Sequence, residues 1–160
     1  MTWHGCKKTL TAVAPKIVIA DTDVFMNAPI KLTRSGFGDM IGKYIALTDW
    51  KIAHILTNEF YCERIARITL EATKSVLEAV DGIIGGQRQS YEKLMYGLLL
   101  SGLAMQMMGN SRPASGSEHH LSHYFEVTGL LRGEPYFCHG IDVAYSTYVT
   151  AKLRQELQNI

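Results

Sequence analysis

The sequence has little excess charge of either sign. It contains 16 lysines and arginines against 15 aspartates and glutamates, so the formal charge of the 160 residues is only +1. Proteins that bind nucleic acid or an anionic membrane surface carry a basic patch or stripe, and this balance predicts neither partner. The hydrophobic share of 47% is ordinary for a globular domain with a real core.

Long apolar runs and paired cysteines are also missing. The most apolar segment, residues 94–108, is shorter than a bilayer span and includes serine and glutamine. The first ten residues, MTWHGCKKTL, have no apolar stretch behind their charges, as a secretory signal would need. Cys6, Cys62 and Cys138 are an odd number without close spacing, which favours a reducing compartment. We therefore expect a cytoplasmic protein without membrane insertion.

A glycine-rich nucleotide-binding turn is absent as well. The nearest glycine cluster, GGQRQS at residues 85–90, follows no predicted strand and does not fit G-x-G-x-x-G. No residue is assigned to NAD or NADP on this basis.

Helical periodicity is what the sequence does contain. Apolar spacing predicts helices over residues 38–58, 59–80, 90–108 and 143–157, and another that begins near residue 116. The β-branched run KIVIA, residues 16–20, predicts one buried strand. The fold class is therefore mainly α, a helical bundle with one short strand near the N-terminus. Because a lone strand has nothing to pair with, we expect part of a larger fold.

Three of the six histidines lie in SGSEHHLSHYFE, residues 115–126. The S-x-x-E spacing of Ser115 and Glu118 predicts a capping box at the start of a helix. On that helix His119 and His123 share a face, and Glu126 continues it. Two imidazoles on one face bind a transition metal well, or one binds while the other moves protons. The alternative is a surface cluster without a function.

Two other stretches carry candidate ligands. In SGFGDMIGKY, residues 35–44, Asp39 is expected in the first turn of a helix, with Lys43 one turn later. In YFCHGIDV, residues 136–143, His139 stands at the entrance to the last helix. An ordinary N-terminal acid and a capping or core histidine are the alternative interpretations.

Taken in order, GFGD, EHxxxH and HG resemble the iron-containing alcohol dehydrogenase and dehydroquinate synthase-like superfamily. GFGDMIGKYIALTDWKIAH and RPASGSEHHLSH look most like its sn-glycerol-1-phosphate dehydrogenases. The resemblance implies a divalent metal, zinc or nickel with iron possible, held by Asp39, His119 and His139. It implies that His123 contacts substrate and transfers a proton.

The resemblance also implies an activity. Such enzymes interconvert sn-glycerol 1-phosphate and dihydroxyacetone phosphate with NAD or NADP, in phospholipid synthesis. Besides Asp39 and His123, the substrate-binding candidates are Lys43 and Arg112, the latter beside the helix start at residues 116–118, where backbone N–H groups could bind phosphate. Arg112 could instead only brace its loop, and Lys43 could be solvated.

The resemblance covers roughly residues 5–145. It implies that residues 1–160 are an incomplete helical metal-binding domain of that family, without its N-terminal nucleotide-binding domain. We therefore expect a fragment that is not active alone, with a separate nucleotide-binding domain or a homo-oligomer as possible partners. A dehydroquinate synthase-like enzyme or a general alcohol or glycerol dehydrogenase is one alternative. A non-catalytic metal-binding remnant is another.

Overall fold

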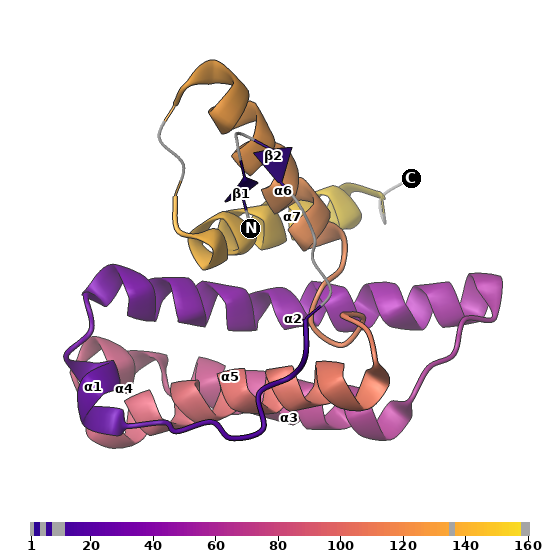
Figure 1. Cartoon of the computed structure of the whole chain (residues 1–160). Helices are drawn as coiled ribbons and strands as arrows, with labels where there is room; N and C mark the ends of the chain where they lie inside the picture. The colour runs from indigo at the N-terminus through magenta and orange to yellow at the C-terminus, as the bar shows by residue number, and fades with distance from the viewer. Residues whose placement is uncertain (1, 4–5, 8–11, 135–136, 158–160) are drawn as a thin grey trace.

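One long helix, α2 (Ile30–Thr57), separates two layers of shorter helices. The computed structural model describes residues 2–3, 6–7, 12–134 and 137–157. Helices α3 (Glu63–Glu78) and α5 (Arg88–Met108) pack on one side of α2. Helices α6 (Ser117–Arg132) and α7 (His139–Leu157) pack on the other side, as Figure 1 shows. The prediction of a mainly α bundle is confirmed.

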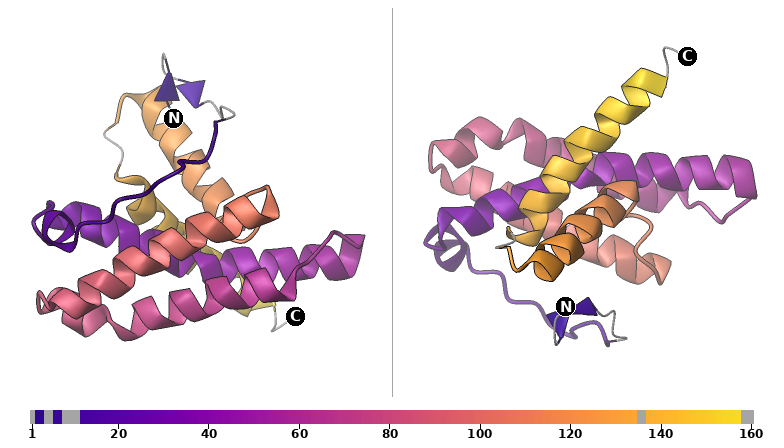
Figure 2. Two further views of the ribbon diagram at one scale, coloured as in Figure 1. Left: turned by 60° about the horizontal axis from the view of Figure 1, so that its bottom comes forward. Right: turned by 90° about the horizontal axis from the view of Figure 1, so that it is seen from above.

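Two short helices and two short strands complete the fold of the described residues. Helix α1 (Thr22–Met26) precedes α2, and α4 (Val80–Ile84) connects α3 to α5. Strands β1 (Thr2–Trp3) and β2 (Cys6–Lys7) form a small antiparallel hairpin. Residues 12–20 have no regular structure and lie against α5 before the chain enters α1 (Figure 2). Among the described residues, no helix is both long and apolar enough to cross a bilayer.

The strand predicted over residues 16–20 does not form. This segment has no strand partner among the described residues, and Ile17 and Ile19 are 79% and 90% exposed. Its β-branched residues favour extended backbone, but a strand is stable only when a neighbour takes up its backbone hydrogen bonds. The prediction of a buried strand was therefore wrong for this structure.

Helix α2 begins earlier than predicted, at Ile30 directly after Pro29. Gly36 and Gly38 lie inside the helix and do not mark its start. The predicted end is confirmed, because Asn58 takes the left-handed conformation with a φ of 57° and its N–H donates to His54 O. A left-handed residue of this kind is a common helix terminator.

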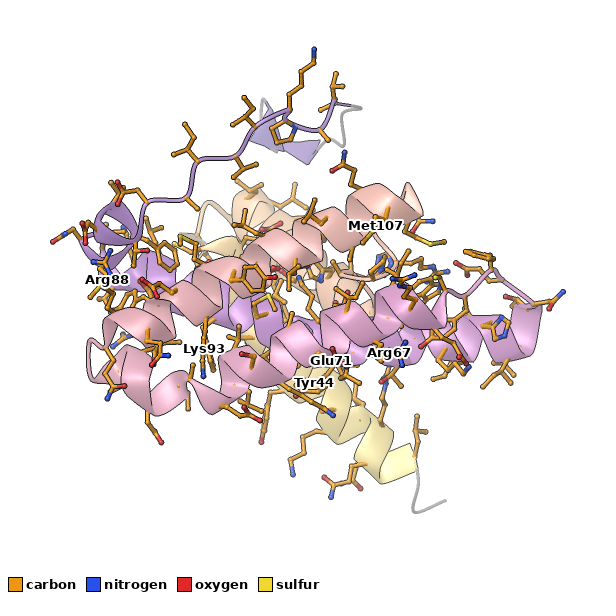
Figure 3. All side chains as sticks on the ribbon, turned by 90° about the horizontal axis from the view of Figure 1, so that it is seen from below. Tyr44, Arg67, Glu71, Arg88, Lys93 and Met107 are labelled. Carbon is orange, nitrogen blue, oxygen red and sulfur yellow. The ribbon has the colours of Figure 1, made fainter. Side chains whose placement is uncertain are left out.

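The layer formed by α3 and α5 against α2, which we call the apolar layer, contains the main hydrophobic core. Its buried side chains are Met40, Ala72, Val76, Ala79, Ile83, Tyr91 and Leu94. A smaller cluster of Leu47, Trp50 and Ala66 extends it toward the end of α2. The outer surface of this layer carries exposed charged side chains, among them Arg67, Glu71 and Lys93 (Figure 3).

On the opposite side, α2 and α7 touch through glycine. A Cβ atom added at Gly38 would lie 2.2 Å from Gly140 O, and one added at Gly140 would lie 1.8 Å from Ser35 O. At Gly42 an added Cβ would meet Val143 Cγ1 at 2.7 Å. Only glycine allows this approach of the two backbones. The crossing therefore places Asp39, which follows Gly38, beside His139, which precedes Gly140.

Candidate metal centre

The three candidate metal ligands, far apart in the sequence, converge at one place. Asp39 comes from α2, His119 from α6 and His139 from the first position of α7. Each offers one ligand atom, and these atoms lie within 4.8 Å of one another. His119 Nε2 is 3.4 Å from Asp39 Oδ1, and the rings of His119 and His139 have centroids 5.2 Å apart. One carboxylate and two imidazoles are a donor set that suits zinc and related divalent metals.

Asp39 does not lie in a first helical turn, because α2 begins nine positions earlier, at Ile30. Its charge is stabilised by side chains instead of by the helix terminus. Lys43 Nζ donates to Asp39 Oδ2 at 2.7 Å, and the Lys43 side chain is only 2% exposed. Burial alone would raise the pKa of Asp39, but the hydrogen bond with His119 and the Lys43 charge outweigh it and hold this pKa well below its usual range.

His119 is fixed from both sides of its ring. Its Nδ1 lies 2.6 Å from Glu118 Oε1, while Nε2 faces Asp39. A carboxylate can only accept, so Nδ1 carries the proton in this bond and Nε2 is directed at Asp39, the other candidate ligand. Burial acts to lower the pKa of His119, but the hydrogen bonds to Asp39 and Glu118 raise it overall.

Glu118 is fully buried and has a second contact, with the backbone N–H of Gly116 at 2.9 Å. Gly116 is the N-cap of α6, and it has no side chain to cap the helix, so the predicted capping box with Ser115 is wrong. The N–H of Ser117 donates instead to Asp49 Oδ2 of α2 at 2.7 Å. Asp49 also pairs with Arg154 near the end of α7. The start of α6 is therefore tied to both neighbouring helices.

This arrangement changes the expectation for phosphate binding. Protein carboxylates already occupy the N–H groups of Gly116 and Ser117. Arg112 forms a two-pronged pair with Glu59, with Nε–Oε1 at 2.7 Å and Nη2–Oε2 at 2.6 Å. The structure thus holds Arg112 against the connection between α2 and α3, and its contacts agree with a bracing role.

His139 and His123 complete the cluster. The His139 side chain is 44% exposed, and its Nδ1 lies 3.2 Å from Glu126 Oε1. The His123 ring has centroid distances of 6.3 Å to His119 and 6.0 Å to His139. His123, on the same face of α6 as predicted, therefore lies beside the candidate ligands His119 and His139. The carboxylate contact of Glu118 with His119 was missed by the sequence analysis, although an acid next to a candidate ligand was the available signal.

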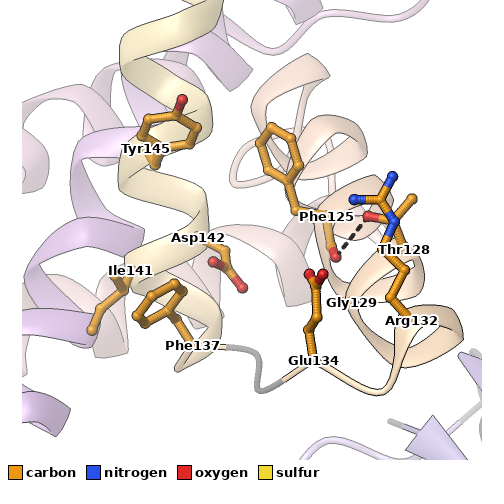
Figure 4. Close-up of a pocket in the computed structure, with 9 residues that line it drawn as sticks. All are labelled: Phe125, Thr128, Gly129, Arg132, Glu134, Phe137, Ile141, Asp142 and Tyr145. Carbon is orange, nitrogen blue, oxygen red and sulfur yellow. Dashed lines mark hydrogen bonds between the residues drawn. The ribbon is translucent and has the colours of Figure 1, made fainter.

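A pocket of about 470 Å³ adjoins the cluster between the end of α6 and the start of α7. Phe125, Phe137 and Tyr145 form aromatic walls, and Arg132 and Asp142 supply opposite charges (Figure 4). The candidate ligands Asp39, His119 and His139 do not line it. The pocket is therefore a neighbour of the centre and not the centre itself.

No protein-family model matches the chain. Curated relatives do match, among them three proteins named glycerol-1-phosphate dehydrogenase acting with NAD(P)+. The protein of Geobacillus thermodenitrificans is 41% identical over 154 residues, which are 96% of this chain and 38% of that protein. The Bacillus subtilis protein is 39% identical over 140 residues, 88% of this chain and 36% of that protein. The archaeal protein of Hyperthermus butylicus is 40% identical over 139 residues, 87% of this chain and 39% of that protein.

The chain thus spans less than two fifths of the length of these relatives. Within that span the identity is near 40% in bacterial and archaeal proteins alike. The resemblance that GFGD, EHxxxH and HG indicated is confirmed: over 96% of its length the chain is related to a segment of the glycerol-1-phosphate dehydrogenases.

Proposed function

We propose that the chain is the metal-binding part of an NAD(P)-dependent oxidoreductase that interconverts sn-glycerol 1-phosphate and dihydroxyacetone phosphate in the cytoplasm. The observation that carries the proposal is the convergence of Asp39, His119 and His139 from three helices within 4.8 Å. A relationship to glycerol-1-phosphate dehydrogenases over 96% of the chain supports the reaction class.

The donor set fits a single divalent cation, zinc or nickel, with iron as a third option. Two neutral imidazoles and one carboxylate leave coordination positions open for a substrate oxygen. When bound there, such a cation polarises the ketone or acidifies the alcohol of the substrate.

The protein side chains would orient these ligands and move the proton. Lys43 holds one oxygen of Asp39, so that the other faces His119. Glu118 and Glu126 contact Nδ1 of His119 and of His139, and both rings can present Nε2 to the cation. His123 stands beside this position and is suited to give a proton to the substrate oxygen, or to accept one from it.

The nicotinamide cofactor would be held by a nucleotide-binding domain that acts together with this chain. When bound, this cofactor would supply hydride-transfer chemistry to the carbon that bears the substrate oxygen. We propose that such a domain, and not this chain, supplies the residues that choose between NAD and NADP.

The first test is the metal content of the purified chain. We expect close to one transition metal per chain in the wild type and none in an Asp39→Ala, His119→Ala, His139→Ala triple variant. His120→Ala is a matched control, because His120 is an exposed histidine of the same helix. A metal-free wild type after reconstitution would contradict the proposal.

The second test supplies a nucleotide-binding part. The region of the Geobacillus thermodenitrificans relative that this chain does not match is expressed separately and mixed with the metal-loaded chain. We expect NADH oxidation that depends on dihydroxyacetone phosphate and that disappears with His123→Ala. A chain that binds metal but stays silent in this mixture would point to a non-catalytic metal-binding role instead.

A further inference from the structure

A second group of metal-binding side chains lies next to the first. His123, Glu126 and His139 each offer a ligand atom, and these atoms also lie within 4.8 Å of one another. We propose that this outer group binds a second divalent cation, distinct from the one at Asp39, His119 and His139. The inference concerns cation binding alone and does not depend on the reaction proposed above.

The chemistry of the outer group resembles that of the inner one. Two imidazole nitrogens and one carboxylate oxygen are ligands that zinc prefers. His123 and Glu126 are three positions apart on α6, so the helix itself places them on one face. Glu126 is 9% exposed and lies at the contact between α6 and α7, where its carboxylate is held against His139.

His139 belongs to both groups, and its two ring nitrogens allow this. Nδ1 lies 3.2 Å from Glu126 Oε1 and therefore faces the outer group. Nε2 is left for the inner group. For Nδ1 to bind a cation, the proton on this nitrogen would have to pass to solvent.

The shared ring makes the outer position the weaker one. Its cation must displace a proton from His139 and is repelled by the inner cation. We therefore expect it to fill only at metal concentrations at least tenfold above those that fill the inner position.

Titration of the whole chain with cobalt(II), whose absorption bands report its ligands, tests this inference. The wild type should bind two ions in two steps. Glu126→Gln should keep the tight ion and lose the weak one, because a glutamine amide is a poor metal ligand. Asp39→Asn should lose the tight ion and keep the weak one. His120→Ala, the exposed neighbour, should match the wild type.

The outcomes separate this inference from the proposed function. A wild type that binds only one ion, with Glu126→Gln lowering its affinity about 10- to 100-fold, would overturn the second site and leave Glu126 as the group that orients His139. An Asp39→Asn variant that keeps the tight ion would count against the inner centre and not against the outer one. If Glu126→Gln does not fold, His123→Asn makes the same distinction.

Discussion

The two sides of α2 are built from different kinds of buried side chain. On the apolar layer side, α2, α3, α4 and α5 bury aliphatic and aromatic residues around Leu94 and Met40. On the other side, the layer of α6 and α7, which we call the polar layer, buries mainly polar groups. They are Glu118, His119, Ser122, Glu126, Asp142, Ser146, Thr147 and Thr150. Val143 is the one large hydrophobic residue of α6 and α7 that is buried among those described.

Because of this difference, we expect the apolar layer to supply most of the stability, while the polar layer carries the candidate metal site. Burial of apolar area stabilises a fold, whereas each buried polar group needs a partner to offset its desolvation. Five buried side-chain oxygens of the described residues have no hydrogen-bond partner: Glu118 Oε2, Ser122 Oγ and Ser146 Oγ in α6 and α7, Thr69 Oγ1 in α3 and Thr33 Oγ1 in α2. We therefore expect the apolar layer to hold the molecule together, and α6 and α7 to open first when no cation is bound.

The largest effect on stability is expected from the apolar layer. Leu94 is fully buried, so Leu94→Ala leaves a cavity and should lower the free energy of unfolding by about 2 to 5 kcal/mol. Denaturant unfolding followed by circular dichroism measures this loss. The folded variant should still bind a metal ion at Asp39, His119 and His139 with wild-type affinity, and loss of this binding would show that the two layers are not independent.

Gly38→Ala should affect the polar layer and lower the free energy of unfolding by less than Leu94→Ala does. The new Cβ would meet Gly140 O at 2.2 Å, so α2 and α7 must move apart, and we expect a destabilisation of about 1 to 3 kcal/mol. Because Asp39 and His139 lie at this crossing, metal affinity should fall at least tenfold in isothermal titration.

The matched control is Gly102→Ala in α5, where an added Cβ meets nothing within 4 Å. This change should stabilise the helix by up to about 1 kcal/mol through alanine's better helix propensity and leave metal affinity unchanged. Equal effects at both glycines would contradict the close contact between α2 and α7.

Lys43→Met tests how the buried charge of Asp39 is balanced. The change removes the ammonium group, so the apoprotein should lose about 1 to 2 kcal/mol as the carboxylate loses its closest donor. A bound cation replaces that positive charge. Added zinc should therefore raise the thermal midpoint of Lys43→Met more than that of the wild type, and an equal rise in both would show that Lys43 does not balance Asp39.

The smallest effect is expected at Arg112. Its pair with Glu59 is partly exposed, so Arg112→Ala should cost at most about 1 kcal/mol and leave metal binding unchanged. In the two-part activity assay, the Michaelis constant for dihydroxyacetone phosphate should also stay the same. A tenfold or larger rise in this Michaelis constant would indicate that Arg112 binds the phosphate of the substrate.

The sequence predicted the helices better than the contacts between them, and the candidate metal ligands that it indicated do lie close together. Apolar spacing located the helices, because that spacing follows directly from which face is buried. The stop at Asn58 was predictable since asparagine tolerates the left-handed conformation. The meeting of Asp39, His119 and His139 came from the resemblance of three motifs, since no local rule brings residues of α2, α6 and α7 together.

What could not be predicted depends on contacts between helices. The glycines before Asp39 were interpreted as a helix boundary, whereas they allow α7 to approach α2. The cap of α6 comes from Asp49, which is 68 positions before Ser117 in the sequence. The run at residues 16–20 has the composition of a strand, but composition cannot supply the neighbouring strand that it needs.

The pairing of Asp49 with Arg154 and with the N–H of Ser117 has a practical consequence for anyone who attaches a tag or fusion partner. Arg154 lies in the last turn of α7, yet through Asp49 it steadies the turn that presents His119. We expect a rigid fusion joined directly after Leu157 to displace Arg154. Through Asp49, this displacement would disturb the position of His119. A flexible spacer, or a tag at the other end of the chain, would leave this support intact.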